Sequence, residues 1–398
     1  MTHGRPSHYI TDPAELESFC RRIQHCSRLA LDTEFVGEET FVPRLELIQI
    51  AGPDESAAID FPAVKGQPAL DSLWNVICDP HIEKVVHAGR QDLELVAIHA
   101  GRIPTPFFDT QLAAAMVGYG AQVAYAGLVQ RVAGKRLAKS HTFTNWSHRP
   151  LTKDQITYAL EDVQFLLPIH DRLRARLKTL GREEWIREEF NRLQATLGER
   201  SRGPEERYQR IRGWDNLQPR AAAVLRELAS WREGEAKRRN VPRGRVLRDE
   251  VLLQVSRQVP KTLEELRAIR GVHPSEVDRS GESLLATIQR ALALPAAEWP
   301  EIPRDRKPEP DATGKMELLQ AVLKARALEE DISPSLLTTT ADLQALLDSK
   351  EDPARLNLPI VQGWRRKLAG ETLLQLLDGK LLVQLDRESG KVRLSQVS

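Results

Sequence analysis

The stretch RLALDTEF, residues 28–35, constrains the fold more than any other part of the sequence. Apolar and polar side chains alternate along it with a period of two, which predicts a β-strand with one face turned to a core. Side chains two residues apart on a strand point the same way, so Asp32 and Glu34 project from one face. Burying two carboxylates is costly unless a cation balances them. A solvated sheet face is the alternative that this pair alone leaves open.

The segments that follow predict an α/β fold built on a mixed sheet. Strand-like runs at 44–52 and 56–61 come close behind the first and are separated by the turn residues GPDE, which suggests an antiparallel meander. Two further short strands, at 84–88 and 105–110, alternate with segments of helical spacing. Hairpin-linked strands followed by strands interleaved with helices are typical of an α/β sheet.

The second half of the chain has an almost wholly helical pattern. A polar segment at 201–213 and a segment with five prolines at 294–314 predict two linkers. The final stretch, LLVQLDRESGKVRLSQV, predicts a terminal β-hairpin. The expected domains are an α/β domain and two small all-α domains, at residues 1–205, 214–296 and 312–398.

Bulk properties exclude several classes of protein. A net charge of +1 gives no overall attraction to nucleic acid, so any basic surface must be local. Three cysteines without CxxC spacing argue against a disulfide framework or a cysteine zinc site, and they fit a reducing cytoplasm. The uncharged run at 110–130 is too rich in glutamine and glycine to span a membrane, and it predicts two short alanine-rich helices. No apolar secretory signal is present at the N-terminus, so we expect a cytoplasmic protein.

Two later segments add acidic residues to the pair on the first strand. In HAGRQDLELV, Asp92 opens a helix directly after a strand, where the helix dipole favours a carboxylate even without a ligand. In YALED, Tyr158 and Asp162 are four residues apart and share one helix face, although an exposed pair is the alternative. Carboxylate oxygens are hard ligands that favour Mg²⁺ or Mn²⁺ over zinc. Together the segments predict a metal site.

In this order, LDTEF, HAGRQDLELV and YALED resemble the three motifs of the DEDDy branch of the DEDD exonuclease superfamily. Residues 10–200 are further similar to the ribonuclease D family, in TEFVGEETFVPRLELIQIA, FFDTQLAAAMVGYG and the segment from Trp146 to Leu173. Residues 214–294 resemble an HRDC domain, which ribonuclease D proteins carry behind the nuclease domain. The resemblance implies a ribonuclease H-like mixed-sheet exonuclease domain followed by two HRDC-type domains.

The same resemblance implies hydrolysis of RNA from its 3′ end by two divalent ions, Mg²⁺ or Mn²⁺, with release of 5′-mononucleotides. Carried over residue by residue, Asp32, Glu34 and Asp162 hold the ion that binds the attacking water. Asp32 also reaches a second ion, near which Asp92 acts directly or through a water molecule. By the same resemblance, Tyr158 would orient the attacking water and help to deprotonate it. Because a tyrosine with a pKa of about 10 is a poor base at neutral pH, we expect its main role to be positioning, with the metal lowering the pKa of the water. The implied partners are RNA, above all tRNA precursors, and we expect a monomer.

Two residues are candidates for substrate contacts. Phe35 is placed to pack on a terminal base or sugar, although its phase along the strand equally suits a core residue. Lys139, in LAKSHTFTNW, is a candidate for a phosphate contact or else a solvated lysine. In the same segment, Phe143 and Asn145 stand where the family usually has an arginine and an acidic residue. No metal ligand is lost by this departure, so we expect activity to survive.

A basic segment at 232–248 holds seven basic and two acidic residues. It is a candidate surface for tracking phosphates, with a solvated and partly salt-bridged helix face as the alternative. Two other functions also stay open: a catalytically silent nucleic-acid-binding module on a nuclease fold, and an exonuclease acting on DNA. The five clustered motif residues argue against the first. A helicase is excluded, because no GxxxxGK[ST] phosphate loop occurs.

Overall fold

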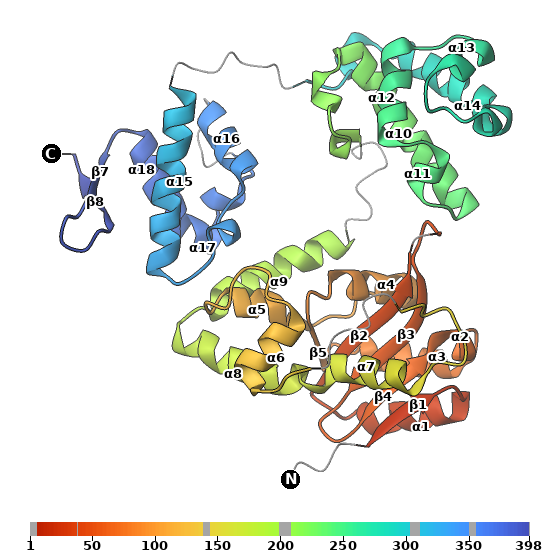
Figure 1. Cartoon of the computed structure of the whole chain (residues 1–398), viewed down its shortest axis with the longest axis vertical. Coiled ribbons are helices and arrows are strands. Elements are labelled where there is room, and N and C mark those ends of the chain that lie inside the picture. Colours follow the sequence, from red (N-terminus) through yellow and green to blue (C-terminus); the bar gives the residue numbers. More distant parts are fainter. Residues whose placement is uncertain are drawn as a thin grey trace. The chain divides into compact units, whose positions relative to one another are not determined.

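The first part of the chain is built around one mixed β-sheet (Figure 1). The computed structural model describes residues 6–37, 39–137, 144–198, 208–302, 311–349 and 356–397. Within these residues, the sheet has six strands in the order β1-β4-β3-β2-β5-β6. The strands are β1 (Ser7–Ile10), β2 (Arg28–Val36), β3 (Arg44–Ala51), β4 (Ser56–Asp60), β5 (Glu83–Val86) and β6 (Phe107–Asp109).

Strand pairing confirms the mixed sheet that the sequence predicts. β3 and β4 are antiparallel, with Ile48 opposite Ile59. β5 pairs in parallel with both β2 and β6. β1 is a strand that the sequence pattern does not predict; it pairs in parallel with β4 and places Ile10 opposite Ile59. Its four residues, SHYI, are too short and too polar to stand out as a strand.

Nine helices accompany the sheet in the described part of residues 6–198. They are α1 (Pro13–Ile23), α2 (Phe61–Val64), α3 (Ala69–Ile77), α4 (Arg90–Ala100), α5 (Thr110–Ala115), α6 (Tyr125–Ala133), α7 (Lys153–Gln164), α8 (Leu166–Thr179) and α9 (Glu183–Gly198). The helices α5 and α6 confirm the two alanine-rich helices expected within 110–130. No helix in the described residues has the length and apolar character needed to cross a membrane.

One face of the sheet is covered by α7 and α8. Ala30 of β2 and Val85 of β5 share a buried cluster with Val163 and Leu166 of these helices. Since side chains two residues apart on a strand share a face, the face covered here is also the face of the even-numbered residues of β2. The packing therefore holds α7 beside the strand that carries the predicted ligands.

Residues 208–302 form a helical module with a core of its own. Its elements are η3 (Trp214–Asn216), α10 (Pro219–Arg239), α11 (Arg243–Val246), α12 (Asp249–Gln258), α13 (Leu263–Ala268), α14 (Pro274–Leu292) and η4 (Ala296–Glu298). Tyr208 and Ile211 are buried in this core, so the linker predicted over 201–213 is wrong for its last residues. Ile302 packs against the same core, so the second linker also starts later than predicted.

The last part of the chain is helical and ends in the predicted hairpin. Its elements are α15 (Ala312–Glu329), η5 (Pro334–Leu336), α16 (Thr340–Asp348), η7 (Pro359–Val361), α17 (Gly363–Arg365), η8 (Arg366–Gly370), α18 (Glu371–Leu377), β7 (Leu381–Leu385) and β8 (Val392–Gln396). The antiparallel pairing of β7 with β8 confirms the terminal hairpin.

These C-terminal helices share one apolar core with the nuclease helices. Val322 of α15 and Trp364 of α17 belong to the same buried cluster as Leu128 of α6 and Ile169 of α8. The described residues within 1–34, 46–197 and 308–398 accordingly form one compact unit of the fold.

A buried polar contact joins the nuclease helices to the C-terminal helices. Glu189 of α9 accepts hydrogen bonds from Arg365 Nη2 at 2.8 Å and from Trp364 Nε1 at 3.0 Å. The ring of Trp185 stacks on that of Trp364, with the ring centroids 4.9 Å apart. Glu189 and Arg365 are both buried, so this ion pair lies inside the shared interface.

Candidate active site

Strand β2 presents the first two predicted ligands. Asp32 and Glu34 are partly buried, and their positions on the strand place them on the same face as Ala30. Because Ala30 packs beneath α7 and α8, the two carboxylates lie on the sheet face where α7 can reach them.

Helix α7 presents the next two residues. Its start is fixed by a capping box: Thr152 Oγ1 accepts from the backbone N–H of Gln155 at 3.2 Å, and Gln155 Oε1 accepts from the backbone N–H of Thr152 at 2.8 Å. Tyr158 and Asp162 then follow one helical turn apart. The Tyr158 hydroxyl donates a hydrogen bond to the Asp162 carboxylate.

Three of the predicted ligands meet in a compact cluster. One carboxylate oxygen each of Asp32, Glu34 and Asp162 lies within 4.8 Å of the other two. Burial raises the pKa of Asp32 well above its usual value, and the charges of Asp92, Asp162 and Glu34 raise that pKa further. Burial, followed by the charges of Asp162 and Asp92, raises the pKa of Glu34 to about 8. Oxygen donors that repel one another in this way fit a divalent cation.

Asp92 lies next to this cluster without belonging to the group of three. It stands in the first turn of α4 and is buried, and its carboxylate accepts a hydrogen bond from the Thr33 hydroxyl. Thr33 precedes Glu34 on β2, so this bond links α4 to the ligand strand. After burial, the charge of Asp92 is the largest of the causes that raise the pKa of Asp32.

A further carboxylate, which the sequence pattern does not mark, supports the turn that presents Asp92. The buried Asp109 accepts hydrogen bonds from the backbone N–H groups of Ala88 at 3.1 Å and Gly89 at 3.0 Å. A Cβ atom on Gly89 would lie 2.5 Å from the side chain of Val86, so this close turn requires glycine. Asp109 also caps α5, and an acidic residue before an alanine-rich helix is the signal that could have identified it.

The phenol of Tyr158 is neutral in this environment. Burial raises its pKa above the ordinary value, and the charges of Asp162, Glu34 and Asp32 raise it further. The buried ring of Trp146 lies against it, with the ring centroids 6.2 Å apart and the planes inclined by 35°. Tyr158 is therefore a hydrogen-bonding group rather than a phenolate at neutral pH.

Of the two predicted substrate-binding residues, the structure describes only Phe35, which is not a member of the acidic cluster. Phe35 is partly buried near the end of β2, directly after Glu34. Lys139 lies outside the described residues, as does Phe143. Asn145 is exposed, and its Oδ1 atom accepts a hydrogen bond from the backbone N–H of Ser147 at 3.0 Å. Asn145 thus shapes the chain just before α7.

The basic segment at 232–248 is partly neutralised within its own module. Its ion pairs are Arg232 with Asp249, Arg238 with Glu235, Arg239 with Glu235 and Glu276, and Arg243 with Glu233. Lys237, Arg245 and Arg248 are exposed, and within the described residues they form no ion pair. These three side chains, which we call the basic triplet, remain available to an anionic partner.

The fold and the acidic cluster define a class of enzyme, the 3′–5′ exonucleases. A family profile described as 3′–5′ exonuclease matches residues 7–178. A second profile, the HRDC domain, matches residues 221–288 within the helical module.

Whole-chain comparisons give the family. The ribonuclease D of Nitrobacter hamburgensis is 37% identical over 385 residues, which cover 95% of this chain and 97% of the relative. The ribonuclease D of Pseudomonas paraeruginosa is 38% identical over 376 residues, covering 93% and 97%. The crystal structure of Escherichia coli RNase D, described as an exoribonuclease involved in structured RNA processing, matches with a TM-score of 0.81 and 31% identity, covering 93% of this chain and 98% of that one. The chain belongs to the ribonuclease D family and is a 3′–5′ exoribonuclease.

Proposed function

We propose that this enzyme releases 5′-mononucleotides from the 3′ ends of RNA with two divalent ions, Mg²⁺ or Mn²⁺, bound at the acidic cluster. The observation that carries the proposal is the approach of Asp32, Glu34 and Asp162 within 4.8 Å beside the Tyr158 hydroxyl. Carboxylate oxygens at this density suit hard cations. Ions held there would activate the attacking water and neutralise the charge that develops on the phosphate.

Each side chain has a separate task in this proposal. Asp32, Glu34 and Asp162 would hold one ion, and Asp32 would also reach the second. Asp92, held by the Thr33 hydroxyl, would act on the second ion directly or through a water molecule. Tyr158 keeps its proton because its pKa is raised, so it would position the attacking water by hydrogen bonding and would not act as its base.

The proposed substrates are tRNA precursors, processed at their 3′ ends. The support is the RNase D of Escherichia coli, which is described as involved in structured RNA processing. We further propose that the enzyme acts as a monomer in the cytoplasm, and its three free cysteines suit a reducing compartment.

Two residues remain proposed substrate contacts. Phe35, next to Glu34, would stack on the terminal base or sugar, where stacking tolerates any sequence. Lys139 would contact a phosphate.

Labelled oligomers test the proposal directly. With Mg²⁺ or Mn²⁺, 3′-labelled RNA should release labelled 5′-mononucleotide at once, and 5′-labelled RNA should shorten one nucleotide at a time. EDTA should abolish both, and Asp92→Asn should slow the reaction about a hundredfold or more, because bound ions supply several kcal/mol of transition-state stabilisation.

The matched control is Asp154→Asn, which changes an exposed carboxylate in the first turn of α7 and should leave the rate unchanged. Full activity in EDTA would rule the metal mechanism out. Equally fast degradation of DNA would favour a DNA exonuclease instead.

A further inference from the structure

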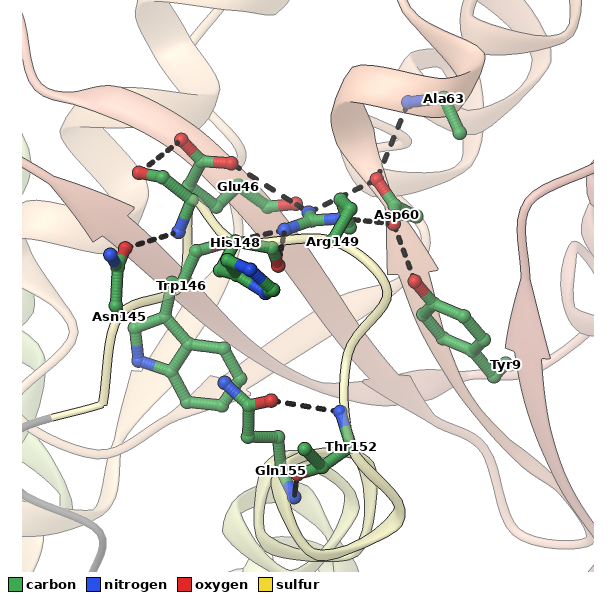
Figure 2. Close-up of polar contacts among 11 residues, drawn as sticks. Tyr9, Glu46, Asp60, Ala63, Asn145, Trp146, His148, Arg149, Thr152 and Gln155 are labelled. Atoms are coloured by element: carbon green, nitrogen blue, oxygen red, sulfur yellow. Dashed lines mark hydrogen bonds and ion pairs between the residues drawn. The ribbon is translucent and has the colours of Figure 1, made fainter.

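One arginine ties the segment that enters α7 to the sheet. Figure 2 shows the Arg149 side chain between Glu46 and Asp60. Its Nε atom donates to Asp60 Oδ2 at 2.5 Å, and its Nη2 atom donates to Asp60 Oδ1 at 3.1 Å. The same Nη2 atom donates to the backbone carbonyl of Glu46 at 3.2 Å. Glu46 lies on β3 and Asp60 ends β4, so Arg149 spans two neighbouring strands.

The other end of the guanidinium closes the turn from which Arg149 comes. Its Nη1 atom donates to the backbone carbonyls of Trp146 and of His148, the latter at 3.1 Å. The hydroxyl of Ser147 adds a hydrogen bond to Glu46 Oε1 at 3.2 Å. Residues 146–149, which we call the anchor turn, are thus folded on themselves and fixed to the sheet (Figure 2).

Two connections lead from the anchor turn to Tyr158 and its helix. The buried ring of Trp146 lies against the ring of Tyr158. Along the chain, the anchor turn is followed within three residues by Thr152, the residue that caps α7. A shift of the anchor turn would therefore move both the ring that touches Tyr158 and the first turn of its helix.

We propose that Arg149 is a positioning residue for the exonuclease reaction: it holds the anchor turn on the sheet, so that Trp146 sets the place of Tyr158 beside Asp162. The inference rests on the proposed role of Tyr158 in orienting the attacking water. Arg149 itself bonds to Asp60, Glu46, Trp146 and His148, so it acts through the anchor turn. Lysine would keep the charge but could not reproduce the planar fork of donors.

A structural role alone predicts a different outcome. An arginine that served only stability would slow the reaction by the same factor whether or not Tyr158 had its hydroxyl. A residue that acts through the hydroxyl loses its effect when that hydroxyl is removed. A double-mutant cycle separates the two cases, because it measures the coupling between the two side chains.

The experiment uses the full-length chain, Mg²⁺ and a 5′-labelled RNA oligomer under single-turnover conditions. Arg149→Lys should lower the maximal rate about tenfold with little change in KM, because a small displacement of a positioned group is costly in the transition state. Tyr158→Phe should itself be slow. Adding Arg149→Lys to Tyr158→Phe should then lower the rate by less than about twofold.

Two further variants keep the test decisive. Arg22→Lys is the matched control, because the Nε and Nη2 atoms of Arg22 also donate hydrogen bonds to a carboxylate, that of Glu55. This substitution should leave the rate unchanged. Asp60→Asn weakens the same anchor from the other side and should show the same coupling to Tyr158→Phe. It replaces Arg149→Lys if thermal unfolding shows that the lysine variant does not fold.

The outcomes separate this inference from the proposed function. Equal rate losses in the presence and absence of the Tyr158 hydroxyl, or no loss with Arg149→Lys, would overturn the positioning role alone. If Tyr158→Phe were as fast as the unchanged enzyme, the proposed role of Tyr158 would fail and the inference with it. A wild-type chain that releases no mononucleotide would overturn the proposed function itself.

Discussion

Carboxylates in this protein differ in what surrounds them, and the difference separates the proposed metal ligands from the carboxylates that support the fold. Asp60 is held by the Arg149 guanidinium, and Asp109 accepts backbone N–H groups. Asp32 and Glu34 instead face other carboxylates, which raise their pKa on top of the effect of burial. A group of carboxylates that repel one another is stabilised by a cation, whereas a compensated carboxylate is already stable without one.

These pKa directions predict how metal and pH act together on stability. Burial raises the pKa of Glu34 to about 8 and that of Asp162 to about 7, whereas both groups titrate at about 4 in an unfolded chain. The metal-free protein should therefore lose stability as the pH rises from about 4 to about 8, because the folded state must give up protons that the unfolded state has already lost. Mg²⁺ or Mn²⁺ should raise the melting temperature, and by more at about pH 8 than at about pH 5.5.

Thermal unfolding in EDTA and in excess Mg²⁺ measures this effect. Asp162→Asn should remove most of the gain at the higher pH, because it removes one of the three clustered carboxylates that are proposed to hold the ion. Asp154→Asn, on the exposed side of the same helix, should keep the gain. A gain from Mg²⁺ that was the same at both pH values would contradict the assignment of the protons to this cluster.

At the scale of residues, the sequence predicts the functional side chains that follow from local spacing. It misses those whose role depends on contacts with distant parts of the chain. The strand pair Asp32 and Glu34 and the helix pair Tyr158 and Asp162 follow from periods of two and four residues, and the structure brings three of their carboxylates together. Asp109 and Arg149 act through contacts with residues 20 and 89 positions away, and no local period encodes such contacts.

At the scale of elements, the basic segment shows how a charge count overstates an available surface. Four of its seven basic side chains are paired with acidic groups of the same module. Two of the acidic partners, Asp249 and Glu276, lie outside the segment, so the charge count of the segment could not show the pairs that Arg232 and Arg239 form with them. Only the basic triplet is left to meet an anionic partner.

Replacing the basic triplet should weaken RNA binding in a salt-dependent way. The variant Lys237→Ser/Arg245→Ser/Arg248→Ser, made together with Asp92→Asn to prevent cleavage, should bind RNA less tightly at low salt. The slope of log Kd against log salt concentration should fall by about 2, since each phosphate contact on a single strand contributes about 0.7.

A charge-matched control makes the prediction specific. Lys261→Ser/Arg267→Ser/Arg270→Ser removes three exposed basic residues of the same module outside the segment. It should change the slope much less. If both variants lost affinity equally, net charge rather than the basic triplet would explain the effect.

The boundaries of elements and modules also show what sequence patterns leave out. β1 is a strand because β4 offers it a parallel edge, and its own four residues carry no clear period. Residues 208–211 read as polar linker, yet Tyr208 and Ile211 fill the helical core. Both misses concern short segments whose structure is set by a partner rather than by their own composition.

At the scale of the whole molecule, the C-terminal helices are part of the nuclease unit's core. The helical pattern of residues 312–398 predicts their secondary structure, but it does not reveal that Trp364 and Val322 pack with the nuclease helices. The apolar side chains of such helices could pack in a core formed by their own segment or in a core shared with another segment. The spacing of apolar residues alone does not distinguish these two arrangements.

The buried ion pair between Glu189 and Arg365 should contribute more to stability than an exposed ion pair. Burial raises the pKa of Glu189, but hydrogen bonding and charge from Arg365 outweigh it, so the pKa is lowered overall. Glu189→Gln leaves the Arg365 guanidinium buried without a counter-charge and should lower the free energy of unfolding by about 3–5 kcal/mol.

Urea unfolding, followed by tryptophan fluorescence, checks this value. Glu184→Gln on the same helix is the control, because its pair with Arg187 is largely exposed and should contribute less than about 1 kcal/mol. A loss for Glu189→Gln no larger than that of the control would show that the interface does not depend on the buried pair.

The shared core has a consequence for how the protein is made. The last nuclease residues of that core, near Glu189, leave the ribosome long before Trp364 and Leu373 are synthesised. At about 5–20 residues per second, the interval is roughly 10 to 40 seconds, during which the rings of Trp185 and Phe190 have no partner from the C-terminal helices. A ribosome that stalls in this interval would release a nascent nuclease with an open apolar face, which is the kind of surface that chaperones bind.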